Sequence, residues 1–328
     1  MKLERVDPFD DEAVAATRAL TEAAQAVDTP WDPPKGPVTF AGLLRHGWDG
    51  EPDEVWLLYD GDTPIAKLTV NLPQRDNRHR GNVFVQVHPD HRRRGHGRAL
   101  LEEGLARVKT AGRRLALTYS IDAPGPSAFL RNAGFTPGSV EIQRRQDLHA
   151  VDQERVAKLR EEARAAARDY TLLRLVDAVP DDLVDEVAEI TAAINDAPTD
   201  DLDIEDEVYD AKRIRAFEAA HAAARVRVYR LVARLGEDGP LAGQTIVAVP
   251  SDQPGWAWQY DTSVMRAHRG HRLGLLLKSE MMAWLAEAEP TVRWIDTWNA
   301  ESNAHMIAVN EALGYSIVAR GVTWQRAV

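Results

Sequence analysis

The stretch Val83-Phe-Val-Gln-Val-His-Pro-Asp-His-Arg-Arg-Arg-Gly-His-Gly-Arg-Ala-Leu-Leu101 occurs a second time, altered, as Tyr260-Asp-Thr-Ser-Val-Met-Arg-Ala-His-Arg-Gly-His-Arg-Leu-Gly-Leu-Leu-Leu-Lys278. In each copy a β-rich segment runs into a short loop of Arg, Gly and His, and an apolar helical segment follows. A loop of this kind at the start of a helix can hold a phosphate group. Its presence twice indicates two versions of one nucleotide-cofactor domain.

The spacing of later landmarks supports a duplication. Each half continues to a Gly-aromatic pair, Gly134-Phe135 in the first and Gly314-Tyr315 in the second. The landmarks stay in register at an offset of 177 to 180 residues, which is far longer than the period of solenoid repeats. We therefore predict an N-terminal domain at 1–150, a helical connector at 151–169 and a C-terminal domain at 170–328.

Composition narrows the class of protein. The chain has 328 residues, of which 44% are hydrophobic, so it can fill two cores of ordinary size. It has no cysteine, which excludes disulfides and a thiol nucleophile. Its net charge of -11 argues against nucleic acid as a partner. No apolar run approaches a membrane span and the N-terminus lacks a signal-peptide core, so we expect a cytoplasmic protein with no membrane partner.

The order of predicted elements is similar in the two halves and indicates a mixed α/β class, with an α+β mixed sheet in each domain. Residues 28–38 contain four prolines and are predicted to form a loop. In the first half we expect strands at 2–6, 54–59, 64–72, 82–88, 115–120 and from 135, with helices at 11–26, 94–111 and 126–133. In the second we expect strands at 171–176, 225–235, 241–249, 256–264, 293–298 and 315–325, with helices at 152–168, 181–195, 210–224, 272–288 and 303–313.

The loop from Arg92 to Gly97 has the physical properties of a pyrophosphate site. The first N–H groups of a helix lack partners inside it, and the helix dipole adds partial positive charge there. Gly95 and Gly97 allow a ligand to approach the backbone. Arginines supply charge-assisted hydrogen bonds. Taken alone, Arg-x-x-Gly-x-Gly also fits a helix start with solvated arginines.

The combination of a strand, Val-x-Pro, Arg-x-x-Gly-x-Gly, an apolar helix, a strand and Gly-aromatic resembles the GNAT superfamily of acyl-CoA-dependent N-acyltransferases. The resemblance covers nearly the whole chain twice, as in the two-domain architecture of mycothiol synthase, although no residue fixes that substrate. It implies that acyl-CoA enters a gap between two splayed parallel strands, opened by a β-bulge in the fourth strand of each half. Those strands would be 82–88 with 115–120, and 256–264 with 293–298.

The resemblance also implies which residues bind the cosubstrate, acetyl-CoA or another acyl-CoA. In the first copy Val87 would contact pantetheine, and the pyrophosphate would lie against Arg92, Arg93, Arg94, Gly95, His96, Gly97 and Arg98. The second copy supplies Val264, Arg269, Gly270, His271, Arg272, Leu273, Gly274 and, on the later helix, Asn303. It departs from the family pattern because Arg272 replaces the middle glycine, where its side chain is expected to crowd the loop.

Candidate catalytic groups lie mainly in the second half. Direct attack of an amine on a thioester needs a base and an oxyanion donor. Asp261 is a candidate base on the bulged strand, or else a strand-end Asp that orders a loop. Its neighbour Tyr260 is a catalytic candidate too, and the sequence leaves open which of the two faces the cleft. The family's acid is often a Tyr, but that slot holds Leu130 in the first half and Asn310 in the second. Asn310 is either a sulfur or cofactor contact or a surface amide. Asp296 and His305 lie nearby, His305 more in keeping with a helix surface or core.

These residues predict an acetyl-CoA-dependent N-acetyltransferase that acts on a primary amine of a small molecule, with catalysis in the C-terminal domain. The acidic stretch 196–207 would attract a cationic amine, or is a solvated loop. Alternatives are a non-catalytic acyl-CoA sensor and a protein N-acetyltransferase. No metal site is expected, since His88, His91 and His96 lack a completing ligand set. We expect a monomer or homodimer.

Overall fold

The computed structural model describes every residue from Met1 to Val328. The chain forms two compact units that are assembled from separate segments of sequence. Unit 1 comprises Met1–Glu141, Thr199–Asp206 and Arg320–Val328, and unit 2 comprises Ile142–Pro198 and Glu207–Ala319. Strand β6 (Thr136–Asp147) begins in unit 1 and ends in unit 2, whereas β12 (Ser316–Ala327) begins in unit 2 and ends in unit 1. The domain boundaries drawn from the sequence repeat stay a prediction; they are 1–150, 151–169 and 170–328.

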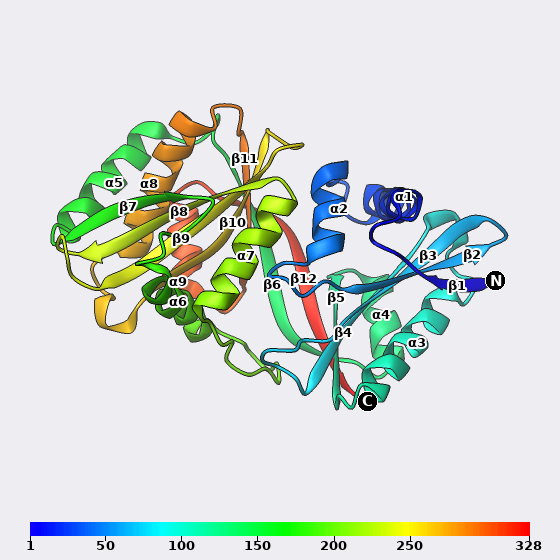
Figure 1. The fold of residues 1–328 in the computed structure, drawn as a ribbon. Coiled ribbons are helices and arrows are strands. Elements are labelled where there is room, and N and C mark those ends of the chain that lie inside the picture. Colours follow the sequence, from blue (N-terminus) through cyan, green and yellow to red (C-terminus); the bar gives the residue numbers. More distant parts are fainter. The chain divides into compact units, whose positions relative to one another are not determined.

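Unit 1 is a mixed sheet with helices on both faces (Figure 1). Its strand order is β1-β2-β3-β4-β5-β12-β6, and β4 and β5 run parallel. The larger core lies under α3, and a smaller cluster lies under α1. The complete elements are β1 (Lys2–Arg5), α1 (Asp11–Asp28), α2 (Pro37–His46), β2 (Glu54–Asp60), β3 (Thr63–Asn71), β4 (Arg80–Val87), the 3-10 turn η1 (Pro89–His91), α3 (His96–Thr110), β5 (Leu115–Ile121) and α4 (Pro124–Asn132).

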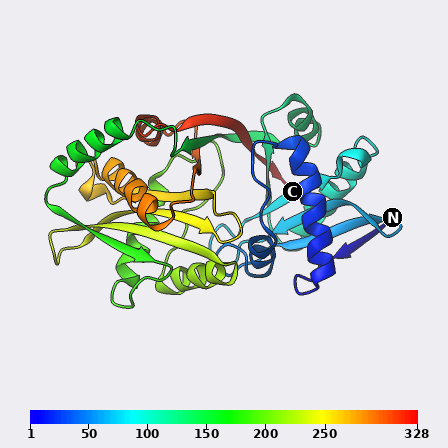
Figure 2. The same ribbon diagram turned by 90° about the horizontal axis from the view of Figure 1, so that it is seen from above.

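Unit 2 has the strand order β6-β11-β10-β9-β8-β7, with β10 and β11 parallel. Helices α5 and α8 cover one face of this sheet and α7 the other, as Figure 2 shows. The complete elements are α5 (Gln153–Ala166), β7 (Tyr170–Val176), α6 (Val184–Ala192), η2 (Ala193–Asp196), α7 (Ala211–Ala223), β8 (Val226–Leu235), β9 (Leu241–Pro250), β10 (Trp256–Val264), η3 (Arg266–His268), α8 (Leu273–Ala288), β11 (Trp294–Ala300) and α9 (Ala304–Ala312).

The elements form where the residue pattern predicts them, to within a few residues at their ends. Helix α2 was missed, and it starts inside the segment expected to be a loop. It begins at Pro37, after Gly36, and ends at His46, before Gly47, which adopts φ 67°. Proline suits the first helical position because its missing N–H would have no partner there, and glycine tolerates the left-handed residue that ends a helix. The sequence contains both Pro37 and Gly47, but the four prolines between residues 28 and 38 predicted a loop instead of a helix start.

Candidate active site

The two parallel strands of unit 1 part as expected for a ligand gap. β4 and β5 pair at Arg80–Leu115, Gly81–Ala116 and Asn82–Leu117, and no pairing continues beyond. The remaining residues of β4, from Val83 to Val87, keep only β3 as a partner. Their register with β3 is unbroken, so the expected bulge is absent from this strand. Unit 1 therefore has a free strand edge, to which an extended ligand could add as a strand would.

In unit 2 the parallel strands also part, and here a bulge is present. β10 and β11 pair only from Trp256–Trp294 to Trp258–Asp296. Immediately beyond, the register of β10 against β9 shifts between Gln259 and Thr262. Tyr260 and Asp261 are thus the bulged residues, at the point where β10 leaves β11. A bulge re-aims side chains and backbone amides, which is why it is common beside active sites.

Both Arg/Gly/His loops have the same backbone shape despite different sequences. The first has positive φ angles at Arg93 (62°) and Gly95 (90°), and the second at Gly270 (88°) and Arg272 (56°). The corresponding positions are 177 residues apart, so each loop pairs one glycine with one arginine in exchanged order. A non-glycine residue with positive φ is uncommon, and each loop has one, Arg93 in the first and Arg272 in the second, which indicates that tertiary context imposes the turn.

The helix that follows each loop begins with no side-chain cap. α3 starts after Gly95 and α8 after Arg272, both left-handed, whereas α1, α5, α7 and α9 are capped by Asp or Asn. A Cβ added at Gly95, Gly270 or Gly274 would meet no atom within 4 Å. The uncapped N–H groups and the open space in front of them fit the pyrophosphate of CoA. The expected crowding by Arg272 is absent, since its guanidinium turns to Glu162 of α5 at 3.2 Å.

The predicted phosphate ligands separate into two groups. Arg93, Arg94, Arg98 and His271 are exposed near the loops, and His96 is half-buried. Arg92 and Arg269 are instead engaged within the protein. Arg92 binds Asp28 and the carbonyl of Val87, and Arg269 binds Asp196 and the carbonyl of Val264. These two arginines hold the loop to the end of its strand. Of the exposed residues, Arg94 also donates to the carbonyl of Asp90 at 3.0 Å.

Two further predicted contacts have structural tasks. The side chain of Leu273 is buried in the core of unit 2, so only its backbone can face a phosphate. Asn303 caps α9 by accepting a hydrogen bond from the N–H of Met306 at 3.2 Å.

Asp261 lies in a polar cluster on the α7 side of unit 2. Burial raises the pKa of its carboxyl to about 6; the charge of Glu207 raises it further, whereas Arg230 and Arg213 oppose the shift. Arg213 donates to Glu207 at 2.9 Å, and Tyr209 donates to the same carboxylate at 2.7 Å. A carboxyl with this pKa is ionised near neutral pH and is basic enough to accept a proton from an ammonium group.

Tyr260 lies on the same side as its neighbour. Its ring contacts Phe217 and His221 of α7, and its hydroxyl is 3.4 Å from Nε2 of His221. Burial raises the pKa of the Tyr260 hydroxyl, and the charge of Asp261 raises it further. In a regular strand, consecutive side chains would point to opposite faces. The bulge places Tyr260 and Asp261 together, so both side chains reach the candidate site.

Asn310 is completely buried on α9, not on a helix surface. Its Nδ2 donates to Oδ1 of Asn299 on β11 at 2.7 Å, whereas its own Oδ1 has no hydrogen-bond partner. A buried acceptor without a donor is costly, so this oxygen calls for a partner. A role for Asn310 as a cofactor contact stays a prediction. In unit 1 the equivalent Leu130 is part of the core.

The other two candidates, the carboxylate of Asp296 and the imidazole of His305, lie outside this site. Asp296 is fully buried and binds Arg145 at 2.7 and 2.8 Å and Gln143 at 3.0 Å, which makes it a structural ion-pair partner. His305 is exposed on α9.

Several residues of the cluster were not found from the sequence. Glu207 belonged to the acidic stretch, but Tyr209, Arg213, His221 and Arg230 were missed. Arg230 offered a signal, because it interrupts an otherwise apolar part of β8. It is buried, burial lowers its pKa to about 10, and it donates to Oε1 of Gln244. The residues of α7 offered none, because their role depends on how that helix packs.

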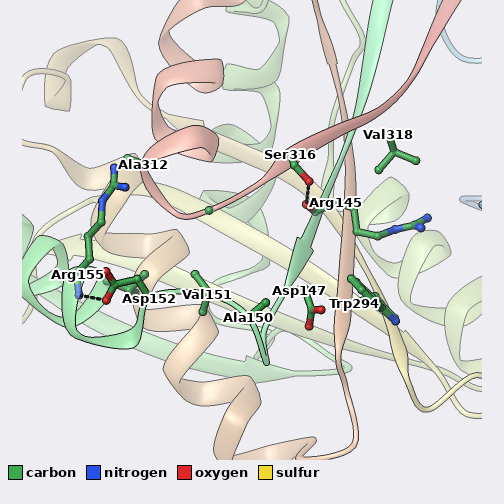
Figure 3. A pocket seen from close by; sticks show the side chains of 12 residues that line it. Arg145, Asp147, Ala150, Val151, Asp152, Arg155, Trp294, Ala312, Ser316 and Val318 are labelled. Carbon is green, nitrogen blue, oxygen red and sulfur yellow. Dashed lines mark hydrogen bonds between the residues drawn. The ribbon is translucent and has the colours of Figure 1, made fainter.

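Unit 2 has a hollow whose lining includes none of these residues, and Figure 3 shows it from close by. It has a volume of about 320 Å³ and is lined by Arg145, Trp294, Val151 and Gly314, among others. Trp294 starts β11, whereas β10 and β11 part at their other ends. Its carboxylates are engaged: Asp147 binds Arg293 at 2.9 Å and Asp152 caps α5. This hollow therefore has no free base and does not compete as the catalytic site.

No three His, Asp or Glu side chains come together in a way that would hold a metal ion. None of the helices combines the length and apolar character needed to cross a membrane.

Comparison with known proteins agrees with this geometry. Residues 51–137 match the family model described as an acetyltransferase (GNAT) domain. The fold is similar to a tandem GNAT protein from the clavulanic acid biosynthesis pathway, with a TM-score of 0.82 and 27% identity over 99% of this chain and 98% of that one. It is also similar to a GCN5-related N-acetyltransferase from Sphaerobacter thermophilus, with a TM-score of 0.68 and 17% identity over 99% and 95% of the two chains. No curated protein matches by sequence.

Proposed function

We propose that this tandem GNAT N-acetyltransferase carries out catalysis in unit 2 and uses unit 1 to bind acyl-CoA without turnover. Acyl-CoA-dependent N-acetyltransfer is the activity of the family, and the proposal concerns which unit performs it and on what acceptor. The acceptor in this proposal is a primary amine of a small molecule, cationic in solution. Acetyl-CoA is the cosubstrate, and the thioester supplies the electrophilic carbonyl.

The observation that carries the proposal is Asp261, a carboxyl with a pKa of about 6 on the bulge where β10 leaves β11. An amine arrives protonated and must lose a proton before it can attack. The carboxylate of Asp261 accepts that proton, directly or through a water molecule. The corresponding part of β4, Val83 to Val87, has no bulge and no titratable side chain.

The rest of the cluster suits a cationic acceptor. Arg213 is engaged with Glu207 and Arg230 with Gln244, which leaves Asp261 as the carboxylate for the acceptor. Its negative charge favours an ammonium group electrostatically before that group is deprotonated. The aromatic ring of Tyr260 adds a face for a cation.

The remaining catalytic requirement is a donor to the oxyanion that develops on the carbonyl. The bulge removes residues 260 and 261 from the β9 register, and β11 no longer pairs with β10 there. We assign the oxyanion donor to a backbone N–H of this bulge. The loops and helix N-termini hold the diphosphate, so positioning contributes in addition to acid–base chemistry.

The test compares Asp261→Asn with Asp238→Asn, a matched change in the turn between β8 and β9, in acetyl-CoA turnover with a panel of small amines. We expect Asp261→Asn to lower kcat by about 10²- to 10⁴-fold, the range for loss of a general base. The control should retain full activity. Normal turnover by Asp261→Asn, combined with loss of turnover on changing Arg94 or Gly95, would move catalysis to unit 1.

A further inference from the structure

Arg230 is a buried cation of unit 2 whose charge no group of the protein neutralises by direct contact. It lies on β8 and is 4% exposed. Its side chain makes one hydrogen bond, from Nη1 to Oε1 of Gln244, and that acceptor is uncharged. Its Nε and Nη2 have no partner, and no carboxylate forms an ion pair with it. A buried charge without a counter-charge is costly, so this guanidinium calls for an anionic partner.

Strand register places Arg230 on the face of the sheet that carries the candidate base. Arg230 pairs with Ile246 across β8 and β9, and side chains that pair directly lie on the same face. Ile246 forms a buried cluster with Phe217 of α7, against which Tyr260 packs. Arg230 therefore lies on the α7 face, and its charge acts on the carboxyl of Asp261.

Asp261 is the second charged side chain of this face that has no partner. Its carboxylate accepts no hydrogen bond and forms no ion pair within the protein. Arg230 and Asp261 are near enough for each charge to act on the other, yet they do not contact each other. The face thus presents one unpaired positive charge and one unpaired negative charge. A ligand that carries an anion and a cation on the same molecule would pair with both.

The other ionisable groups around these two are engaged within the protein. Glu207 acts on the carboxyl of Asp261 and is bound by Arg213 at 2.9 Å. Glu218 acts on the nearby guanidinium of β8 and is bound by Arg215 at 2.7 Å. Nδ1 of His221 lies 2.9 Å from a backbone carbonyl, to which an uncharged ring donates equally well. None of these groups therefore supplies the missing counter-charges.

The equivalent position of unit 1 is apolar. The offset of 177 residues between the two halves relates Thr69 to Ile246. Thr69 pairs with Val55 across β2 and β3, as Ile246 pairs with Arg230 across β8 and β9. Val55 is buried in an apolar cluster of unit 1. The duplicated fold thus accepts a valine at this position, and it carries the guanidinium in the unit that carries Asp261, which favours a role in binding the acceptor.

We propose that the acceptor of unit 2 is an amino acid, whose carboxylate binds Arg230 and whose ammonium group binds Asp261. The inference rests on the proposed function, because Asp261 is the base in both. The acceptor carboxylate takes hydrogen bonds from Nε and Nη2 of Arg230, which is a geometry that a guanidinium favours. Arg230 is then the residue that selects amino acids over simple amines.

The transfer step balances with the groups named. The ammonium group gives one proton to the carboxylate of Asp261, and the neutral nitrogen attacks the thioester carbonyl. A bond forms between this nitrogen and the acetyl carbon, and the bond from that carbon to sulfur breaks. The thiolate leaves with the electron pair and takes up the second proton that the nitrogen loses. The products are an N-acetylamino acid and CoA, and Asp261 returns its proton to solvent.

The first test uses the unaltered chain and pairs of acceptors that differ only in the carboxylate. The pairs are glycine with methylamine, β-alanine with ethylamine, 4-aminobutyrate with propylamine, and L-phenylalanine with phenethylamine. The release of CoA thiol from acetyl-CoA gives the rate. In the favoured pair, kcat/KM for the amino acid should exceed that for the amine by about tenfold or more, mainly through a lower KM. Amines that react as well as their amino acids in every pair would overturn the proposal.

The second test assigns the selectivity to Arg230. In Arg230→Met the ratio of kcat/KM between the favoured amino acid and its amine should fall by about tenfold or more. Arg230→Lys keeps the charge and should restore part of this ratio. Arg227→Met, at an exposed position of the same strand, is the matched control and should keep the ratio. The ratio does not depend on the folded fraction of a variant, and an unchanged ratio in Arg230→Met would contradict the assignment.

These outcomes separate the inference from the proposed function. Equal turnover of amino acids and amines that is lost in Asp261→Asn would keep Asp261 as the base and remove the amino acid as acceptor. Normal turnover by Asp261→Asn would remove the base, and the inference would fall with it. Selectivity for amino acids that depends on both Arg230 and Asp261 would support the two together.

Discussion

Arg92 donates to both carboxylate oxygens of Asp28 at 2.8 Å, and with its Nε it also holds the carbonyl of Val87 at 3.0 Å. One guanidinium thereby ties the end of α1 to the end of β4 just before the phosphate loop. The same arrangement recurs in unit 2, where Arg269 binds Asp196 and the carbonyl of Val264. The first arginine of each motif thus shapes the loop and is engaged within the protein.

This arrangement predicts that geometry matters more than charge at position 92. Arg92→Lys keeps the charge but loses the planar fork, so we expect a loss of CoA affinity of about tenfold for unit 1. Calorimetry on the full chain would measure it. If Arg92 acted mainly as a charge for the phosphates, Arg92→Lys would retain affinity and Asp28→Asn would increase it. The double variant Arg92→Lys/Asp28→Asn should lose less CoA affinity than the two single variants do in sum, because the two residues share one interaction.

Arg272 provides a prediction in the opposite direction. Its φ of 56° is unfavourable by about 1 kcal/mol or more for a residue with a side chain, and glycine adopts it without that cost. Its guanidinium contacts Glu162 in an exposed pair worth at most about 1 kcal/mol. Arg272→Gly should therefore leave stability within about 1 kcal/mol and CoA affinity nearly unchanged. Thermal unfolding and CoA titration measure the two quantities. A large loss of affinity would show that this side chain binds the cosubstrate directly.

The raised pKa of Asp261 predicts the pH dependence of the rate. The base must be ionised, so kcat should rise as pH increases through about 6 and then reach a plateau. Asp261→Asn should remove this lower limb of the pH profile. An acidic limb that persists unchanged in Asp261→Asn would assign the titration to another group.

The same shift has a consequence for stability. The folded-state pKa of Asp261 lies above its value in the unfolded chain, so the folded state holds its proton more tightly. Its contribution to stability is fully present below the unfolded pKa and is lost as pH rises through about 6. Asp261→Asn should therefore raise Tm relative to the unaltered chain more at pH 8 than at pH 4. An equal change of Tm at both values would contradict the shift.

Asp296 should behave as a structural residue. It is fully buried and receives three hydrogen bonds from Arg145 and Gln143. Asp296→Asn leaves a guanidinium without its counter-charge, and we expect a loss of about 3–5 kcal/mol in the free energy of unfolding by urea. Arg145→Met combined with Asp296→Leu should restore much of that loss. Full stability of the single variant would show that the pair contributes little.

The sequence by itself determined the duplication, the order of the elements and the position of both Arg/Gly/His loops. These depend on local signals: alternating apolar residues for strands, and glycine and arginine spacing at the start of an apolar helix. It also indicated Asp261 as a candidate base, because a carboxylate in a strand is unusual. The absence of the bulge from β4 was not readable, since a bulge depends on the register between two strands.

Only the tertiary structure decided which groups act on one another. It placed Tyr260 and Asp261 on one side of the sheet, brought Glu207 and Arg213 beside them, and made Asp296 an ion-pair partner and not a base. It also showed that Arg272 turns away from its loop and that β6 and β12 each begin in one compact unit and end in the other. Local patterns specify where a chain turns or extends, whereas burial, pKa and pairing depend on neighbours distant in sequence.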